Sequence, residues 1–282
     1  MKVISLIENI SGSKNLKSEH ALSLFLEIND KSYILDTGKS GNFIENAKNL
    51  NVDLLNLDAL VISHNHSDHI GGIDKFFEIN KDINVYIKSQ AKLYEYFYHN
   101  ENQQENYYIG NRKGLFEDFN KNFIWIDDFY KLSENLYIFS DKNNNKDFFC
   151  RDKNLLKFKD NMFIEDDFKH ELFLVYVDGD YVSIISSCSH SGIVNIAHTV
   201  KKYFPDKSIK FIIGGFHMDN LSKQGGLNCS TEYIDDVIKE LNTIGFQKIY
   251  TFHCTGLVAF DYMKKLLGDK IEYFKTGDFL EV

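Results

Sequence analysis

The sequence predicts an α/β protein, and within that class an αββα sandwich of two mixed sheets covered by outer helices. Apolar segments of strand length alternate with segments of helical periodicity through most of the 282 residues. Apolar strands in both halves of the chain run directly into a histidine. A chain of this length can bury the core of one layered domain. We therefore expect a single domain over residues 1–282.

The first half of the chain is expected to form one sheet and its covering helices. Two apolar segments are joined by Asn and Asp, which are typical of a hairpin turn. Ser67 or Asp68 is placed to cap a helix, because both residue types favour helix N-termini. The expected strands are 22–28, 31–38, 57–63 and 83–88, and the expected helices are 41–52 and 67–80.

Residues 89–165 have a different character. They are rich in Asn, charged and aromatic residues and show weak periodicity. We interpret this segment as a lid-like insertion that covers a site, since loops carried by a rigid scaffold often line binding sites. Surface loops with a biased composition account for the same pattern.

The second half returns to regular alternation. Two strands surround an Asp-Gly-Asp turn within residues 171–192. Further strands are expected over 209–217, 248–256 and 271–278, and helices over 192–204, 231–246 and 257–268.

Composition excludes several classes of protein. The net charge is -9 and the lysines are scattered, so the basic stripe of a nucleic-acid-binding protein is missing. No run approaches the ~20 apolar residues of a membrane span, and the N-terminus lacks a signal region. The four cysteines are widely spaced, so reduced thiols are expected. We expect a cytoplasmic protein that acts on a small molecule; the sequence leaves its oligomeric state open.

The stretch LVISHNHSDHIGGI, residues 60–73, contains the main candidate site. His64 and His66 are alternate residues of extended chain and therefore point to the same side. Asp68 and His69 follow where the chain turns into helix, and Gly71 and Gly72 allow close backbone approach. This spacing suggests two adjacent metal sites that need further ligands from distant sequence.

Histidines in the second half are candidates for those further ligands. His190, His217 and His253 each follow an apolar strand, and His170 precedes one. A histidine by itself is more often structural, and this is the interpretation for His20, His99 and His198. Cys188 and Cys254 lie close to the same strand ends, and we interpret them as buried, unreactive thiols.

The segment SHNHSDHIGG matches the H-x-H-x-D-H signature of the metallo-β-lactamase fold superfamily. Several other segments, among them SEHALSLFLEI, SCSHSGIVNI, GGFHM and TFHCTG, resemble a branch of that superfamily. The branch includes dihydropterin (ribofuranosyl)aminobenzene-phosphate synthase and related metal-dependent hydrolases. The H-x-E-x-D motif of the flavodiiron relatives is not matched, because His66 stands in place of the glutamate.

The resemblance implies a ligand set. His64, His66 and His190 would bind the first metal ion, with His170 as the competitor of His190. Asp68, His69 and His253 would bind the second, and Asp36 would orient a ligand. Many members carry a bridging aspartate where this chain has SSCSH, so one ion or two are expected. Nitrogen-rich ligation favours Zn²⁺, with Mn²⁺ and Fe²⁺ as alternatives.

The resemblance also implies a hydrolase or group transferase that uses a metal-bound hydroxide. Asp68 is expected to orient the attacking water and to protonate the leaving group. The substrate would be small, anionic and phosphorylated, and related to pterins. Arg112 lies among tyrosines and is expected to grip an anionic group, and His20 to line the pocket. The alternative is a metal-binding sensor or binding protein without turnover.

Overall fold

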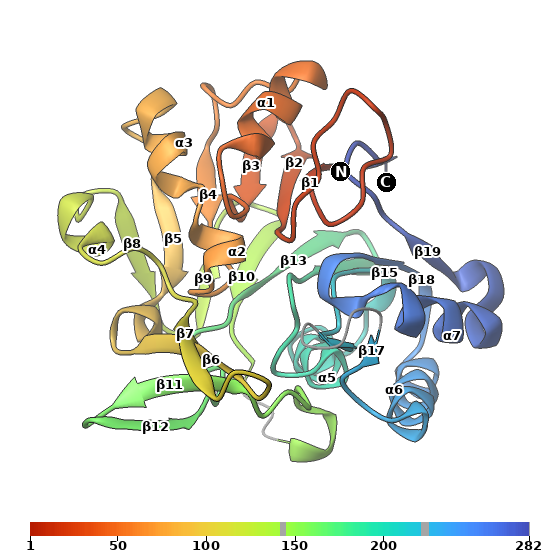
Figure 1. The fold of residues 1–282 in the computed structure, drawn as a ribbon. Coiled ribbons are helices and arrows are strands. Elements are labelled where there is room, and N and C mark those ends of the chain that lie inside the picture. The colour runs from red at the N-terminus through yellow and green to blue at the C-terminus, as the bar shows by residue number, and fades with distance from the viewer. Residues whose placement is uncertain (142–144, 221–225, 282) are drawn as a thin grey trace. The chain divides into compact units, whose positions relative to one another are not determined.

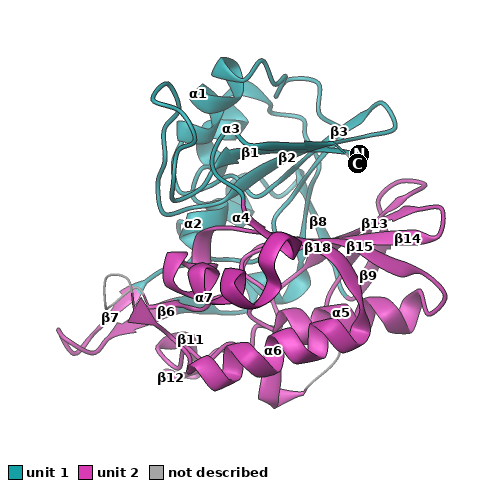
Figure 2. Ribbon diagram, turned by 90° about the vertical axis from the view of Figure 1, so that its right-hand side faces the viewer, with its two compact units in different colours: residues 1–96, 108–127, 274–282 teal, residues 97–107, 128–273 magenta. Residues whose placement is uncertain are grey.

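The computed structural model describes residues 1–141, 145–220 and 226–281, and the chain divides into two compact units (Figures 1 and 2). Unit 1 contains Met1–Tyr96, Tyr108–Asp127 and Phe274–Val282, and unit 2 contains Phe97–Tyr107 and Asp128–Tyr273. Each unit has its own hydrophobic core and one seven-stranded sheet.

The sheet of unit 1 is mixed. Its strand order is β20-β1-β2-β3-β4-β5-β8. The predicted hairpin is confirmed, because β2 and β3 pair antiparallel across the Asn29–Asp30 turn, where both residues have positive φ. From β3 to β8 the neighbouring strands are parallel. The strands are β1 (Lys2–Ile7), β2 (Ser23–Ile28), β3 (Lys31–Leu35), β4 (Ala59–Val61), β5 (Val85–Lys88), β8 (Phe123–Ile126) and β20 (Phe279–Glu281).

Helices of unit 1 pack their apolar residues against this sheet. Phe43 of α1 and Phe76 of α3 are fully buried in the same cluster as the strand residues. The helix predicted over 67–80 is two helices, because the chain is interrupted at Gly71 and Gly72. The capping prediction was wrong, since the N-cap residue is His66 and makes no side-chain cap. The helices are α1 (Asn42–Asn49), α2 (Ser67–Ile70), α3 (Ile73–Ile79) and α4 (Leu115–Asp118).

Gly72 is a position where two backbone carbonyl groups approach the chain closely. A Cβ atom there would lie 2.2 Å from the carbonyl oxygen of Thr37 and 2.4 Å from that of Ser40. Gly72→Ala is therefore expected to destabilise the fold by ~3 kcal/mol, the upper end for overpacking, as measured by urea denaturation. Gly41→Ala is the control, because its Cβ would meet only the Lys75 side chain at 3.4 Å. Equal midpoints for the two variants would contradict this account.

The sheet of unit 2 is also mixed, with the order β19-β18-β15-β14-β13-β10-β9. Strands β14, β15, β18 and β19 are parallel neighbours, and β13, β10 and β9 continue the sheet in antiparallel pairs. The strands are β9 (Phe129–Lys131), β10 (Leu136–Phe139), β13 (Phe173–Asp178), β14 (Tyr181–Ile185), β15 (Ser208–Ile213), β18 (Phe246–Thr251) and β19 (Ile271–Tyr273).

Three amphipathic helices cover this sheet. Figure 2 shows α5 and α6 running alongside each other in unit 2. Their buried residues, such as Val194 and Val237, join strand residues in one cluster, and α7 adds Met263. The helices are α5 (Ile193–Tyr203), α6 (Thr231–Ile244) and α7 (Leu257–Leu267). The two mixed sheets and their helices confirm the predicted α/β class.

The segment 89–165 is more regular than its composition suggested. It contributes β6, β7, β11 and β12 to a four-stranded sheet of order β12-β11-β6-β7, besides β8, β9 and β10. Its residues are divided between the two units, and its role as a lid stays a prediction. The additional strands are β6 (Glu95–Asn100), β7 (Glu105–Tyr108), β11 (Leu155–Lys159), β12 (Met162–Glu165), β16 (Asp219–Asn220) and β17 (Gly226–Leu227).

Four single-turn 3₁₀ helices complete the described elements. They are η1 (Ser89–Lys92), η2 (Lys146–Phe148), η3 (His253–Thr255) and η4 (Gly268–Lys270). Among the described residues, no helix combines the length and the apolar character that crossing a membrane requires.

Candidate metal centre

Unit 1 gathers the histidines of the H-x-H-x-D-H segment directly after β4. Strand β4 lies between the parallel strands β3 and β5, so the carboxyl ends of all three strands lie at the same end of the sheet. His64, His66 and His69 are all buried. The ring centroid of His64 is 4.6 Å from that of His66 and 4.1 Å from that of His69. The chain therefore brings three imidazoles together, as the spacing predicted.

Hydrogen bonds fix two of these rings through Nδ1. Ser63 Oγ donates to Asp36 Oδ2 over 2.8 Å, so its hydroxyl oxygen accepts from His64 Nδ1, 2.7 Å away. Asp36 Oδ2 also accepts from His69 Nδ1 over 2.8 Å. Both rings then carry the proton on Nδ1, which leaves the Nε2 lone pair to bind a metal ion.

The position of the Asp36 carboxylate is fixed by its own hydrogen bonds and by burial. Its carboxylate also accepts the backbone N–H of Ser63 over 2.7 Å, and its side chain is fully buried. Its φ of 64° lies in the left-handed region, which Asp tolerates better than most residues. Asp36 thus orients His69 and, through Ser63, His64.

Asp68 and His69 form the charged part of the unit 1 cluster. Asp68 Oδ2 lies 3.4 Å from His69 Nε2 and 3.6 Å from His20 Nε2. Burial lowers the pKa of His69, but the nearby Asp68 and Asp36 outweigh it and raise that pKa to about 10. The raised pKa means that the two carboxylates stabilise positive charge at this buried position. A metal site requires the same stabilisation.

In unit 2, three histidines follow parallel strands of the sheet. His190 comes after β14, His217 after β15, and His253 opens η3 after β18. All three are buried, and the ring centroids of His190 and His217 are 4.4 Å apart. Strands β14, β15 and β18 are neighbours, and parallel strands have their carboxyl ends at the same end of the sheet. This order explains why these residues, distant in sequence, lie close together.

Glu171 anchors the loop that carries His190, and sequence reasoning missed it. Its buried carboxylate accepts the backbone N–H groups of His190 and Ser191 over 2.7 and 2.9 Å, and the Ser191 hydroxyl over 2.6 Å. Burial raises the pKa of Glu171, and these three donors counteract that rise only in part. An acidic residue directly before the apolar strand 172–177 was the available signal.

Glu171→Gln is expected to destabilise the protein by ~1–3 kcal/mol, because one carboxylate oxygen becomes an NH2 group, which donates and cannot accept the hydrogen bonds made there. Thermal or urea denaturation measures this change. Glu165→Gln is the matched control, since Glu165 is exposed on β12 and should leave the midpoint unchanged. A midpoint for Glu171→Gln within error of the wild type would contradict the anchoring role.

The remaining predicted residues have well-defined surroundings. His170 Nε2 lies 3.0 Å from Asp166 Oδ2, a second carboxylate that sequence reasoning missed. Phe168 stacks on His190 with ring centroids 4.5 Å apart. Arg112 pairs with Asp74 at 2.8 Å and Asp118 at 2.7 Å, and these carboxylates raise its pKa further. Its expected role in gripping substrate stays a prediction.

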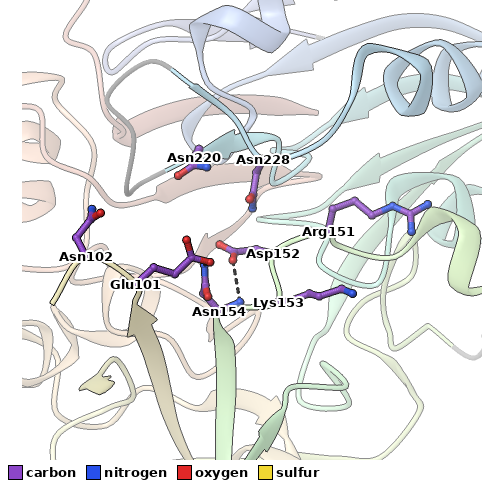
Figure 3. A pocket seen from close by; sticks show the side chains of 8 residues that line it. All are labelled: Glu101, Asn102, Arg151, Asp152, Lys153, Asn154, Asn220 and Asn228. Atoms are coloured by element: carbon purple, nitrogen blue, oxygen red, sulfur yellow. Dashed lines mark hydrogen bonds between the residues drawn. The ribbon is translucent and has the colours of Figure 1, made fainter. Parts of the chain in front are cut away.

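Unit 2 also contains a polar pocket of about 310 Å³. Figure 3 shows that Asp152, Asn154 and Asn228 point toward one another, whereas Arg151 and Lys153 extend the other way. The pocket offers amides and carboxylates that match hydroxyl groups or the edge of a heterocycle. Its lining residues are Glu101, Asn102, Arg151, Asp152, Lys153, Asn154, Asn220 and Asn228.

The donor set fits a divalent transition metal. Within unit 2, ligand atoms of Cys150, His190 and His217 lie within 4.8 Å of one another, as do those of Cys188, His217 and Cys254. In unit 1, His64 and His69 have hydrogen-bonded Nδ1 atoms, and the Asp68 carboxylate lies beside His69. Imidazole, thiolate and carboxylate ligands together favour zinc and its neighbours in the first transition row.

These features define a class of protein. A sequence profile of the Metallo-beta-lactamase superfamily matches residues 19–140. Two large mixed sheets with their helices match solved structures of the same fold. The chain therefore has the fold of the metallo-β-lactamases, and its residues 19–140 are similar to that superfamily in sequence.

Particular relatives resemble the chain along its whole length. The 7,8-dihydropterin-6-methyl-4-(β-D-ribofuranosyl)-aminobenzene-5'-phosphate synthase of Methanocaldococcus jannaschii is 26% identical, covering 100% of this chain and 96% of that protein. Tm1679, a metal-dependent hydrolase of the β-lactamase superfamily, is 25% identical with a TM-score of 0.81, covering 100% and 99% of the two chains. Zn²⁺-bound PqqB from Methylobacterium extorquens shares the fold alone, with 10% identity, a TM-score of 0.61 and full coverage of both chains.

Proposed function

We propose that the protein is a metal-dependent hydrolase or group transferase that acts on a small anionic substrate. The observation that carries this proposal is the buried cluster of His64, His66 and His69. Hydrogen bonds to Ser63 and Asp36 hold the Nδ1 protons of His64 and His69, respectively. An imidazole oriented in this way is prepared to bind a metal ion. Similarity to Tm1679 supports a metal-dependent reaction.

The proposed ligands come from both halves of the sequence. His64, His66 and His190 would bind one ion, and Asp68, His69 and His253 a second. Zinc is the first choice, and manganese and iron are the alternatives. Such an ion, when bound, supplies a water of lowered pKa and polarises the bond to be broken. The pairing of His170 with Asp166 favours His190 as the ligand.

Asp68 is the proposed acid–base residue. It lies within 3.6 Å of two imidazoles, and its side chain is partly exposed to solvent. It can therefore exchange a proton with an attacking water or a leaving group. Asp68→Asn is expected to lower turnover by ~10²–10⁴-fold, measured under saturating metal. A variant that kept its metal and its full turnover would refute this role.

The proposed substrate carries a phosphate and a polar ring or sugar. Support comes from the relative that is named as a synthase of a pterin-linked ribofuranosyl aminobenzene phosphate. The pocket of unit 2 has complementary chemistry, since its amides and carboxylates pair with hydroxyl groups and heterocycle edges. Pterin phosphates and phosphodiesters are therefore the first compounds to test.

The experiment combines metal analysis with a substrate screen. Protein purified without added metal is analysed by elemental mass spectrometry, as wild type, His190→Ala and His170→Ala. We expect stoichiometric metal that decreases in His190→Ala alone, and metal-dependent turnover of a phosphorylated substrate. Absence of bound metal after reconstitution with Zn²⁺, Mn²⁺ or Fe²⁺ would overturn the proposal. Bound metal without turnover across the screen would favour a sensor or binding protein.

A further inference from the structure

We propose that two copies of this chain associate through β12, with the two strands paired antiparallel about a two-fold axis at Phe163. This inference goes beyond the proposed function, because it uses no residue of the candidate metal centre. It depends on residues of unit 2 alone. Its basis is an open strand edge, three consecutive exposed apolar side chains, and an order of side chains that matches itself when it is reversed.

Strand β12 lies at the edge of the four-stranded sheet, whose order is β12-β11-β6-β7 (Figure 1). It pairs with β11 on one side, and on its other side no strand of the described residues is its neighbour. The edge of a sheet presents backbone N–H and C=O groups that can pair with a further strand. Such strand addition is a common way for two protein chains to associate.

The register of the β11–β12 hairpin shows which backbone groups of β12 point outward. The N–H of Asp166 donates to the Leu155 carbonyl over 3.0 Å, so these two residues form a hydrogen-bonded pair. Hydrogen-bonded and non-hydrogen-bonded pairs alternate along an antiparallel ladder. Phe163 and Glu165 therefore belong to non-hydrogen-bonded pairs with β11. Their backbone N–H and C=O groups point away from β11, toward the open edge.

The side chains of β12 are apolar and exposed. Met162 is 60% exposed, Phe163 45% and Ile164 37%. Because successive residues of a strand alternate between its faces, Met162 and Ile164 share one face. Phe163 lies on the other face, where its ring centroid is 5.0 Å from those of Phe97 and Phe158. An open edge with three apolar side chains in a row is prone to aggregate, so we expect β12 to be covered in solution.

The order of side chains in β12 identifies a second copy of the chain as the partner. With the two-fold axis at Phe163, each Met162 lies opposite Ile164 of the second copy, on one face of the paired strands. On the other face, Phe163 lies opposite Phe163 of the second copy. At both ends, the Glu165 carboxylate lies opposite the neutral Asn161 amide, so no like charges meet within this segment. Apolar side chains thus face apolar ones, and polar side chains face polar ones.

A shifted register matches less well. If the axis moves by one residue to Ile164, Met162 lies opposite Asp166 and Phe163 lies opposite Glu165. This arrangement sets two apolar side chains of each copy against carboxylates. The axis at Phe163 is therefore the register that the side chains favour.

Pairing about Phe163 also extends the aromatic packing of the hairpin. Phe97, Phe158 and Phe163 form one aromatic cluster within each copy, and Phe163 is its outermost ring toward the open edge. The two clusters would meet at the axis and continue from one copy into the other. Because each β12 occupies the open edge of the other, this isologous contact closes at two copies.

Analytical ultracentrifugation of the complete chain tests the proposal. We expect the wild type to sediment with twice the mass of the chain, and to dissociate on dilution. Met162→Lys/Ile164→Lys sets lysine opposite lysine at both apolar pairs, so we expect a monomer. Leu55→Lys/Leu266→Lys is the matched control, because it adds the same charge at two exposed leucines outside β12, and it should stay dimeric.

A charge swap tests the register. In Met162→Lys/Ile164→Glu, each introduced lysine lies opposite an introduced glutamate of the second copy. We expect this variant to recover the dimer, which also shows that polar residues at these two positions do not prevent folding. A monomeric Met162→Lys/Ile164→Glu protein beside a dimeric wild type would overturn the assigned pairing, because an axis at Ile164 would set glutamate against glutamate.

Amide hydrogen exchange locates the interface in the wild type. We expect the outward N–H groups of Phe163 and Glu165 to exchange slowly in the dimer, and rapidly in Met162→Lys/Ile164→Lys. A wild type that stays monomeric at its highest soluble concentration would overturn the proposal, as would a dimer in which both amides exchange freely. Neither measurement depends on bound metal or turnover, so a failure here is distinguishable from a failure of the proposed function.

Discussion

Replacing His64 and His66 together by alanine is expected to reduce turnover by about 10³-fold or more. The two rings are buried side by side, and they are the proposed ligands of one ion. Losing that ion removes several kcal/mol of transition-state stabilisation, and about 4 kcal/mol corresponds to ~10³-fold in rate. Elemental analysis should show a matching loss of nitrogen-bound metal.

His198→Ala is the control for this double variant. His198 is partly exposed and lies 3.0 Å from Glu240 on the surface of unit 2, so its loss should change neither metal content nor rate. Thermal denaturation verifies that the double variant is folded. Unchanged metal content and turnover in a folded His64→Ala/His66→Ala protein would contradict the proposed centre.

Asp36→Asn is expected to preserve the fold and to weaken metal binding by ~10–100-fold. Asn tolerates the positive φ of this position, so the backbone can keep its conformation. Its amide nitrogen, however, would face His69 Nδ1 as a donor, where the carboxylate accepts a hydrogen bond. His69 would then carry its proton on Nε2, the atom needed for the metal, as in a catalytic histidine forced into the wrong tautomer.

Asp36→Ala tests the contribution of Asp36 to stability separately from its effect on the tautomer of His69. It leaves the N–H and hydroxyl of Ser63 and the His69 ring without their acceptor, and Ala is strained at positive φ. We expect a loss of about 3 kcal/mol of stability from these two effects. Urea denaturation and zinc titration of both variants provide the comparison. Normal zinc affinity in Asp36→Asn would refute the orienting role.

Local patterns explain why much of the fold could be predicted. The hairpin at Asn29–Asp30 and the helices α5, α6 and α7 depend on residues adjacent in sequence. The unit 1 cluster was predictable for the same reason, because His64, His66 and His69 lie within six residues of one another. The glycines after them fixed the close backbone approach that the structure shows.

Long-range partners could not be predicted. The ion pair of Arg112 with Asp74 joins residues 38 positions apart in the chain, and no local pattern indicated it. In the sequence, Glu171 has no feature that distinguishes it from other charged residues. In the structure, its carboxylate accepts three hydrogen bonds from His190 and Ser191. Strand β20 was missed because its pairing with β1 joins the two ends of the chain. Each of these partnerships depends on chain segments that no local pattern connects.

The local sequence was enough to identify the candidate metal-binding cluster of unit 1, because the spacing of the H-x-H-x-D-H segment places its own side chains close together. The distant residues that lie near one another in unit 2 became visible only in the folded chain. Cys188, His217 and Cys254 looked like isolated residues, and the parallel order of β14, β15 and β18 brings their side chains together. Strand order is a property of the whole sheet, because it is set by packing against a common core and not by the residues that each strand ends with.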